Sequence, residues 1–541
     1  MYGSSLDRVI FVVYLLMNVV VGFWIARRGT SDAKGYFLAG EQLPWYAIGG
    51  SIIAANISTE HFIGMTGAAY SVGFVVAQWE WGNWFTLSVL LWVFLPYYLR
   101  GGIYTMPEFL ERRFNRTCRY IFAVASLILW IVAQMAVVVL AGAKALQGMF
   151  GLSPVWTILG LAVLAGSYTI YGGLKAVAWT DFIQFLTLTI GGAIVAVAGI
   201  HRVGGVVALM HAEPHKFRII YPATDPNYPW FGVFTLFLSI GIWYNCTNQF
   251  IVQRCLGARS EWDARMGVIF AGLMKLAIPF LVVIPGIVAY RLFPGLQDPD
   301  QAYPVLVREL VPSGLAGVVI AGVASALLSH LSSVLNSSST VFTMDLYRPL
   351  LKPNASDRHL VRVGAWSSFA ILLITVAIAI WLAHGQHGVF YLIQDVGAWI
   401  AAPISVVFLL GVLWKRATSI AATTVLLFGF PYTAFLQFFA FQKIGFLKPY
   451  DNFLNRTFLV WITCLVVMAA VSLCTPAPSA EVVDGIVWNR SFLRLPVAER
   501  ALNRGIRSPL LWWSVLVLCA LGLYSYVIWF QFVGQKMLSG I

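Results

Sequence analysis

Residues 49–61 read GGSIIAANISTEH and interrupt an apolar stretch that extends from about 43 to 71. Small residues alone would indicate close packing between membrane helices. From Asn56 to His61, however, an amide, two hydroxyls, a carboxylate and an imidazole follow within six positions. Backbone at this depth can leave the helix only where it lines a cavity or is buried in protein. We therefore predict an unwound segment whose carbonyl groups face a polar site.

A second polar break, WYNCTNQ, occupies residues 243–249. It lies in the apolar segment 229–256, which is the fifth after the segment with the first break. Paired interruptions of this kind are typical of transporters built from inverted repeats around a midplane site. The sequence thus predicts two inverted repeats of five helices.

The composition of the 541-residue chain places it in a membrane. It is 60% hydrophobic and 11% charged, whereas soluble domains have about 45–50% apolar and about 25% charged residues, which excludes a soluble enzyme. A spanning helix needs about 20 apolar residues. We predict an all-α polytopic membrane protein with fourteen transmembrane helices, near residues 7–27, 43–71, 72–99, 118–150, 153–171, 176–200, 229–256, 262–293, 313–348, 359–384, 388–413, 417–440, 456–475 and 509–534.

The basic residues indicate an orientation. With the N-terminus outside, most of the 35 Lys and Arg residues fall in inner loops, as the positive-inside rule requires. We therefore expect a multi-pass plasma-membrane protein with both termini outside. The net charge of +13 includes no long basic run, so a nucleic-acid partner is not expected. No phosphate-binding loop, metal-ligand spacing or nucleophile–base arrangement is present, so we expect no ATP-driven pump, no cofactor and no enzyme.

Two ionisable residues lie inside predicted spans. Glu80 stands in QWEW at 78–81, and Lys275 is in the middle of 262–293. An intramembrane charge is costly and is by default a functional hypothesis. Alternatively, Glu80 belongs to an interfacial belt with its tryptophans. The two charges could offset each other or bind one polar ligand.

A stripe of hydroxyl and amide side chains follows one face of the span that starts near residue 313. Hydroxyls in a span often only bond back to the preceding turn. A whole stripe is better explained as a lining for a hard cation, which prefers oxygen ligands. Asp181 is the carboxylate that could join it, or else a residue that only caps the inner end of its helix. The stripe comprises Ser325, Ser329, Ser332, Ser333, Asn336 and Thr340.

Several stretches resemble the solute:sodium symporter family, and within it the sodium/glucose and sodium/galactose cotransporters. They are AANISTEHFIGMTG at 54–67, Glu80-Trp81, TMPEFLERRF at 105–114, YGGLKAVAWTD at 171–181, WYNCTNQFIVQRCL at 243–256, Lys275-Leu276 and NSSSTVFTMDLY at 336–347. The resemblance implies a LeuT-like core. The expected units are an extra helix and loop at 1–42, a first repeat at 43–228, a second repeat at 229–413, and three further helices with a cytoplasmic loop at 414–541.

The resemblance also implies residue roles. The matching sugar-contact positions are Asn56, His61, Glu80, Tyr244, Lys275 and Gln394, and an outer gate matches Met65, Trp79 and Phe390, with Tyr244 closing the inner side. A sugar offers many neutral hydroxyls, which need mixed donors and acceptors and an apolar ring face. Gly241 stands where the galactose symporter has an amide, and Asn245 replaces the second aromatic of the inner gate, so the identity of the sugar stays open.

The shared sodium site of the family matches Ala54, Ile57, Ala326, Ser329 and, at its second hydroxyl, His330. Imidazole is a poor ligand for Na⁺. Either sodium uses only a second family site, which matches Asp181, Ser332 and Ser333, or His330 replaces the ion, or the register of this helix differs. His titrates near neutral pH, so Na⁺ or H⁺ is the expected coupling ion.

The sequence therefore predicts a secondary transporter of a sugar or polyol that works by cation-coupled alternating access. The expected partners are the sugar or polyol, Na⁺ and the lipid bilayer, and the oligomeric state is open. A proton-coupled or sodium-independent transporter is one alternative. A solute sensor with a separate signalling partner and a transporter of another substrate, such as an amino acid, a carboxylate or sialic acid, are the others.

Overall fold

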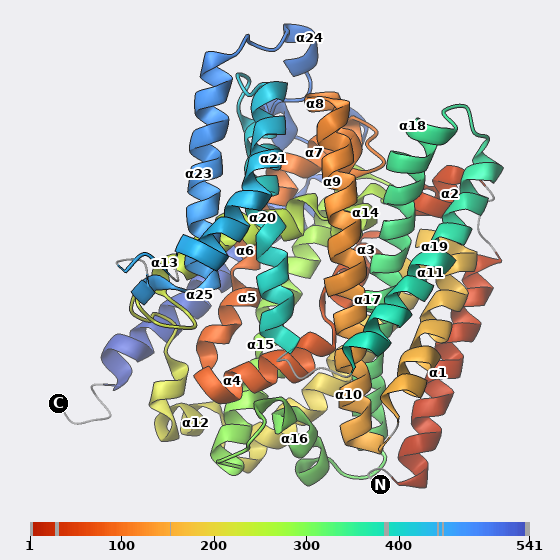
Figure 1. Cartoon of the computed structure of the whole chain (residues 1–541). Helices are drawn as coiled ribbons and strands as arrows, with labels where there is room; N and C mark the ends of the chain where they lie inside the picture. The colour runs from red at the N-terminus through yellow and green to blue at the C-terminus, as the bar shows by residue number, and fades with distance from the viewer. Residues whose placement is uncertain are drawn as a thin grey trace.

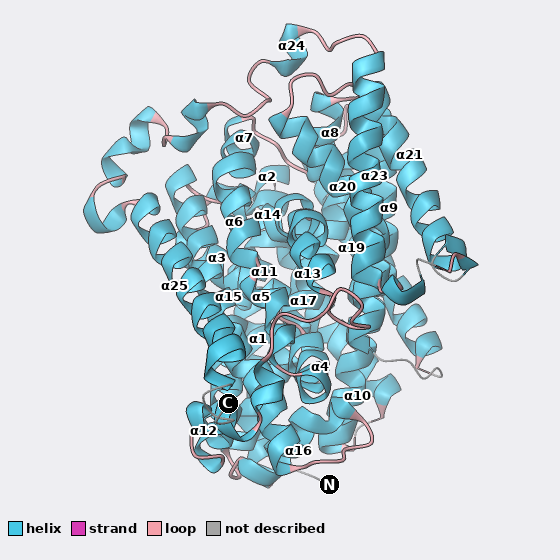
Figure 2. Ribbon diagram, turned by 90° about the vertical axis from the view of Figure 1, so that its left-hand side faces the viewer, coloured by secondary structure: helices cyan, strands magenta, loops and turns pink. Residues whose placement is uncertain are grey.

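The computed structural model describes residues 4–27, 32–151, 153–383, 389–440, 443–445 and 448–535. This part is almost entirely helical, and its only β pairing is two isolated bridges. The start of α1 (Ser5–Ala26) and the end of α25 (Pro509–Trp529) lie in the lower part of the molecule in Figures 1 and 2, and α24 (Ala480–Val483) lies at the opposite end. Within the described residues, eleven helices are long and apolar enough to cross a membrane, and α20 (Val389–Leu413) contributes a shorter apolar stretch, Gly397–Leu413.

The helices follow one another along the chain with short connections. Their bounds are α1 Ser5–Ala26, α2 Ala33–Leu38, α3 Trp45–Asn56, α4 Thr66–Val72, α5 Gln78–Trp81, α6 Asn83–Val89, α7 Leu95–Arg100, α8 Met106–Arg113, α9 Arg116–Leu129, α10 Val138–Phe150, α11 Pro154–Arg202, α12 Val206–Ala212, α13 Trp230–Leu236, α14 Gln249–Leu256, α15 Glu261–Leu292, α16 Ala302–Leu310, α17 Leu315–Val341, α18 Arg348–Leu351, α19 Asp357–Leu382, α20 Val389–Leu413, α21 Ser419–Phe435, α23 Phe453–Cys474 and α25 Pro509–Trp529.

The predicted all-helical membrane class is confirmed, whereas the count of fourteen spans and the inverted repeats stay predictions. One difference concerns the fifth and sixth predicted segments, which lie in a single helix, α11, of 49 residues. This helix changes direction at Gly173, whose φ of 55° and ψ of −154° are not helical. The two segments are thus separated by one residue rather than by a loop.

Gly173 is expected to tolerate no side chain. A Cβ at this position would lie 2.3 Å from the carbonyl oxygen of Tyr36, and the positive φ disfavours any L-residue. We expect Gly173→Ala to destabilise the protein by about 1–3 kcal/mol or more. Its thermal unfolding midpoint in detergent should fall, while Gly160→Ala, in the same helix with open space around it, should not lower it. Equal midpoints for the two variants would contradict the kink.

Helix α1 is fastened to α17, the helix with the polar stripe. Oδ1 of Asp7 accepts hydrogen bonds from the backbone N–H groups of Gly314 (2.8 Å) and Gly317 (2.7 Å). These N–H groups belong to the start of α17, where intrahelical acceptors are missing and a negative charge is favourable. Further along α17, the hydroxyl groups of Ser325 and Tyr14 are hydrogen-bonded to each other at 2.5 Å. The N-terminal end of α17 is therefore fixed by α1.

The start of α15 is fixed by the segment between α24 and α25. The carboxylate of Glu499 accepts hydrogen bonds from the backbone N–H groups of Glu261 (3.2 Å) and Trp262 (2.8 Å), which caps the helix. The Arg265 guanidinium donates to the carbonyl oxygens of Phe492 and Leu493. Because α15 also carries Lys275, these contacts help to set the position of an ionisable group deep in the bundle.

Candidate functional site

The first predicted break is confirmed. Helix α3 ends at Asn56, Ile57 is extended (φ −79°, ψ 113°), and a π-helical turn begins at Glu60. The Ser58 hydroxyl accepts a hydrogen bond from the N–H of Glu60 at 3.1 Å and so satisfies a donor that the break frees. The interruption places several polar side chains at the cavity inside the bundle.

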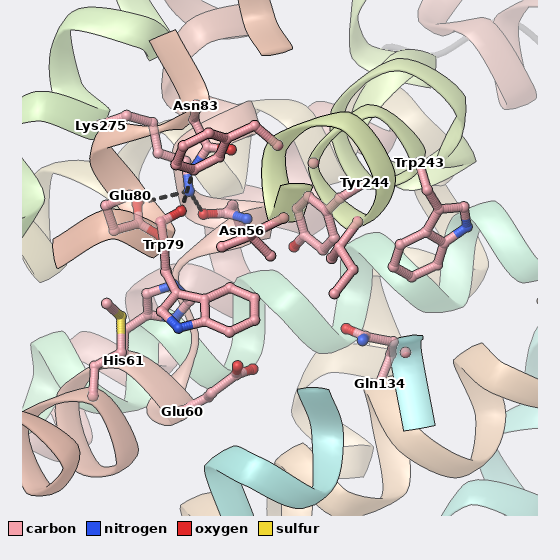
Figure 3. Close-up of a pocket in the computed structure, with 16 residues that line it drawn as sticks. Asn56, Glu60, His61, Trp79, Glu80, Asn83, Gln134, Trp243, Tyr244 and Lys275 are labelled. Carbon is pink, nitrogen blue, oxygen red and sulfur yellow. Dashed lines mark hydrogen bonds and ion pairs between the residues drawn. The ribbon is translucent and has the colours of Figure 1, made fainter. Parts of the chain in front are cut away.

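The second predicted break is confirmed as well. A π-helical turn spans Trp243–Thr247, Asn248 is extended (φ −80°, ψ 122°), and α14 begins at Gln249. The two breaks share one cavity, because Asn56 and Tyr244 both line it. Figure 3 shows these two side chains beside each other in the pocket.

A continuous chain of polar contacts runs through this cavity. The Ser58 N–H donates to Nδ1 of His61 (3.2 Å), so Nε2 carries the proton and donates to Oε1 of Glu80 (3.2 Å). Oε2 of Glu80 lies 2.7 Å from Nζ of Lys275, which also donates to Oδ1 of Asn56 (Figure 3). Four of the residues assigned to the sugar site by resemblance are thus brought together.

The Glu80–Lys275 pair is buried, with side-chain exposures of 3% and 2%. The hypothesis that Glu80 belongs to an interfacial belt is therefore wrong. A buried ion pair contributes little net stability, but removal of one partner costs several kcal/mol because the other charge is left alone. The role of the pair is therefore to hold the Lys275 ammonium and the Glu80 carboxylate in fixed positions at the cavity wall.

The cavity has a volume of about 70 Å³ and mixed walls. Trp79, Tyr244 and Met65, which were predicted as gates, all line it. The Trp79 indole donates to the hydroxyl of Tyr228 at 3.3 Å. Phe390 and Gln394 belong to α20, but their side chains lie outside the described part of the structure.

Three polar lining residues were not predicted: Glu60, Asn83 and Gln134. Asn83 is held by Asn245, whose amide donates to Oδ1 of Asn83 at 2.7 Å. Glu60 was within the quoted break but carried no assigned role. Gln134 is an isolated amide in the middle of a span, and that isolation was the signal that could have identified it.

Asp181 is fully buried beside α17, so the hypothesis that it only caps or snorkels is wrong. Its Oδ2 accepts hydrogen bonds from Ser51 (2.6 Å), Ser333 (3.0 Å) and the Arg254 guanidinium (3.3 Å). Its Oδ1 has no hydrogen-bond partner among the described residues. Oδ1 can therefore accept from one further donor or cation, while the Arg254 guanidinium already pairs with the carboxylate and Ser333 is the α17 hydroxyl that contacts it.

The polar stripe on α17 is buried along its whole length. Most of its hydroxyls bond back to the preceding turn, as Ser325 does to the carbonyl oxygen of Ala321 (2.6 Å) and Thr340 to that of Asn336 (2.7 Å). Ser332 likewise donates to the backbone of Ser329 (3.0 Å) and not to Asp181. Of the second predicted sodium site, the structure joins Ser333 directly to Asp181.

The shared sodium site is only partly assembled. Oγ of Ser329 lies 2.7 Å from the carbonyl oxygen of Ala54 and 3.1 Å from that of Ala326. His330 does not face these oxygens: Nδ1 lies 2.7 Å from the carbonyl oxygen of Ala55, and Nε2 lies 3.0 Å from that of Gln134. A carbonyl oxygen can only accept, so a protonated ring would satisfy both and a neutral ring one. Because both ring nitrogens lie against these carbonyl oxygens, the residues present do not fit Na⁺ at this position.

Known structures resemble the fold. A Na⁺-coupled sialic acid symporter in a substrate-bound outward-open state superposes with a TM-score of 0.76 at 23% identity, over 88% of this chain and 99% of the other. A nucleobase–cation symport transporter in a closed conformation with bound bromovinylhydantoin gives a TM-score of 0.52 at 14% identity, over 84% and 98% of the two chains. At these identities the likeness concerns the fold alone.

Sequence relatives are more similar. The sodium/glucose cotransporter of Vibrio parahaemolyticus is 37% identical over 504 residues, which cover 87% of this chain and 91% of the relative. The sodium/myo-inositol cotransporter of Mus musculus is 32% identical over 538 residues, which cover 88% and 74%. The model of the sodium:solute symporter family matches residues 36–429. With the helical membrane fold and the two broken helices around a polar cavity, these matches show that the chain belongs to the sodium:solute symporter family.

Proposed function

We propose that this sodium-coupled symporter takes up a sugar or polyol, and that the substrate binds in the cavity between the two broken helices. The observation that carries the proposal is the chain of contacts from Ser58 through Glu80 to Asn56. It offers carboxylate, amide and ammonium groups to one small space. Hydroxyls of a sugar both donate and accept, so they can join such a chain at any point.

The walls of the cavity also suit a sugar ring. Tyr244, Trp243 and Trp79 place aromatic groups around the polar chain, and aromatic faces pack against the apolar C–H face of a ring. The names of the relatives, a sodium/glucose and a sodium/myo-inositol cotransporter, point to the same chemistry. We expect the preference among glucose, galactose and inositol to depend on Gly241 and on Asn245, which bonds Asn83 in the cavity wall, because these two positions differ from the galactose pattern.

A carboxylate substrate is disfavoured. Lys275 offsets the charge of Glu80, so Glu80 alone does not repel an anion. Glu60, however, adds a second carboxylate to the cavity wall, and like charges in a site of low dielectric repel strongly. Neutral hydroxylated substrates avoid this repulsion.

Transport requires the cavity to open. Its volume of about 70 Å³ is well below the roughly 300 Å³ or more of small-molecule sites, so a sugar enters only when the walls move. Trp79 would yield on the outer side and Tyr244 on the inner side, in alternation. One sodium ion that moves down 100 mV supplies about 2.3 kcal/mol, which supports more than about a tenfold sugar gradient.

Exchange of sugar across a membrane distinguishes a transporter from a solute sensor. In proteoliposomes loaded with unlabelled glucose, galactose or myo-inositol, external labelled sugar should accumulate transiently by counterflow. Binding without exchange would instead indicate a solute sensor. An unlabelled amino acid, carboxylate or sialic acid should not compete with the labelled sugar. Competition by one of these compounds alone would indicate that the substrate belongs to another class.

Sodium dependence is the second expected result. Replacement of external Na⁺ by choline should lower the initial rate of sugar uptake at least about tenfold, because the driving ion is then missing. The measurement is labelled uptake at fixed membrane potential, repeated from pH 5.5 to 8. Uptake that persists in choline and follows the pH gradient would favour proton coupling instead.

A further inference from the structure

The connection between α24 and α25 carries a group of exposed arginines without counter-charges. Residues 485–508 contain five arginines and a single carboxylate, that of Glu499. This carboxylate is directed inward, where it accepts the backbone N–H groups at the start of α15. Within the described residues, none of the five guanidinium groups has an ion-pair or hydrogen-bond partner, and all five side chains are exposed. We call this group the arginine face, and it comprises Arg490, Arg494, Arg500, Arg504 and Arg507.

The lack of partners distinguishes the arginine face from other arginines at the same end of the bundle. Helix α8 lies at this end, near α24 (Figure 1). Its Arg112 is exposed but pairs with Glu108. Arg116, which is 80% exposed, pairs with Glu111. The positive-inside rule explains why basic residues collect at one side of a membrane, but not why these five have no acidic neighbours. Their charge is therefore available to a partner outside the chain.

The backbone of the connection is bonded to the helix bundle. The Arg100 guanidinium, at the end of α7, donates to the carbonyl oxygens of Ser491 and Arg494. The indole of Trp262 donates to the carbonyl oxygen of Arg507 at 2.7 Å. Figure 2 shows the connection passing the end of α7 before it enters α25. The arginines thus extend from a fixed segment, so a ligand does not have to order a free loop when it binds.

Exposed apolar side chains lie between the arginines in the sequence. Val497 and Ile506 are 75% and 80% exposed. Helix α25 begins at Pro509, directly after the arginine face, and is long and apolar enough to cross a membrane. The indole of Trp512, in its first turn, donates to the carbonyl oxygen of Ile506 at 2.7 Å, and tryptophan is enriched at the membrane interface. The arginines and both apolar side chains therefore lie close to the level of the lipid headgroups.

We propose that the arginine face binds the phosphate group of an anionic phospholipid, and that an acyl chain of this lipid packs against Val497 and Ile506. Guanidinium groups bind phosphate through charge-assisted hydrogen bonds. Basic clusters directly beside a membrane span are typical of surfaces that bind anionic lipids. A soluble phosphate compound would leave the two apolar side chains in water, whereas a lipid covers them. The interaction is independent of the transported substrate.

The preference between two lipids tests the proposal. Native mass spectrometry of the delipidated full chain in detergent gives the affinity of the first bound lipid, with dioleoyl phosphatidylglycerol as the anionic probe and dioleoyl phosphatidylcholine as the zwitterionic one. The anionic lipid should bind at least about tenfold more tightly, because each arginine near a headgroup contributes up to about fivefold. The preference should be weaker at high salt. Equal affinities for the two lipids would overturn the proposal.

Removal of three charges tests the location. Arg500→Gln/Arg504→Gln/Arg507→Gln should lower the affinity for phosphatidylglycerol at least about tenfold and leave that for phosphatidylcholine unchanged. The matched control removes the same net charge from three exposed arginines that pair with carboxylates, and it should keep the preference. It is Arg112→Gln/Arg116→Gln/Arg259→Gln. An equal loss in both triple variants would show that only the net charge matters and would overturn the proposal.

Two further measurements identify the occupant as a lipid. Val497→Asn/Ile506→Asn should weaken binding of phosphatidylglycerol about threefold or more, because the acyl chain loses an apolar contact. Excess inorganic phosphate should not displace the lipid. Unchanged binding by this variant, or displacement by phosphate, would indicate a soluble acidic ligand instead and would overturn the proposal. If a variant does not yield folded protein, the preference measured on the unmodified chain still decides.

Discussion

Glu80→Ala is expected to lower sugar uptake by at least about 100-fold. The substitution removes an acceptor from the cavity and leaves the Lys275 ammonium buried without its counter-charge, at a cost of about 3 kcal/mol or more. Asn56 and His61 also lose their alignment, since both are connected to Glu80 through this chain. The measurement is the initial rate of labelled sugar uptake in proteoliposomes, normalised to inserted protein.

Two controls separate loss of the site from loss of the fold. Glu80→Ala/Lys275→Ala removes both charges, so it should recover thermal stability relative to the single variant while uptake stays low. Glu309→Ala removes an exposed carboxylate that pairs with Arg308 and should leave uptake unchanged, because surface pairs contribute little. Near-normal uptake by Glu80→Ala would place the substrate elsewhere.

Arg254→Met is expected to have the largest effect on stability. The guanidinium is fully buried and bonds Asp181, Ser51, Ser333 and the carbonyl oxygen of Phe250. Without it the carboxylate of Asp181 stays buried and unpaired, which costs about 3–5 kcal/mol. The thermal unfolding midpoint in detergent should therefore fall sharply, and sodium should restore part of the loss by binding to Asp181.

The matched control for Arg254→Met is Arg308→Met. Arg308 pairs with Glu309 on the surface, with side-chain exposures of 42% and 44%, and exposed pairs contribute about 1 kcal/mol or less. Arg254→Met/Asp181→Asn should be more stable than Arg254→Met alone, because no buried charge is left uncompensated. A single Arg254→Met variant as stable as the double variant would mean that the two charges do not depend on each other.

The hydrophobic pattern was sufficient to predict an all-helical membrane protein and both breaks. Apolar runs of span length and the polar stretches at 49–61 and 243–249 are local properties of the chain. Within a bilayer, backbone must be helical unless it is buried in protein or lines a cavity, so these local properties indicate helices and breaks directly. The pattern could not predict that α11 continues through Gly173, because a one-residue kink in an apolar run looks like a loop between two spans.

The roles of single charges could not be decided from the sequence. Whether Glu80 faces lipid headgroups or Lys275, and whether Asp181 caps a helix or meets Ser333, depends on how each helix is rotated in the bundle. Rotation is set by packing between segments far apart in the chain. The same limit explains why Asn83, although it lies close to Glu80-Trp81 in the sequence, and Gln134 were missed.

The central claim is that a sodium gradient drives a sugar or polyol through the cavity around Glu80. Its most direct test is accumulation of labelled sugar in proteoliposomes under an inward sodium gradient and a negative internal potential, compared between the unmodified chain and Glu80→Ala. We predict accumulation above the external concentration for the unmodified chain, which collapses when the sodium gradient is dissipated, and none for the variant. Equal accumulation by both proteins, or accumulation that ignores the sodium gradient, would contradict the account.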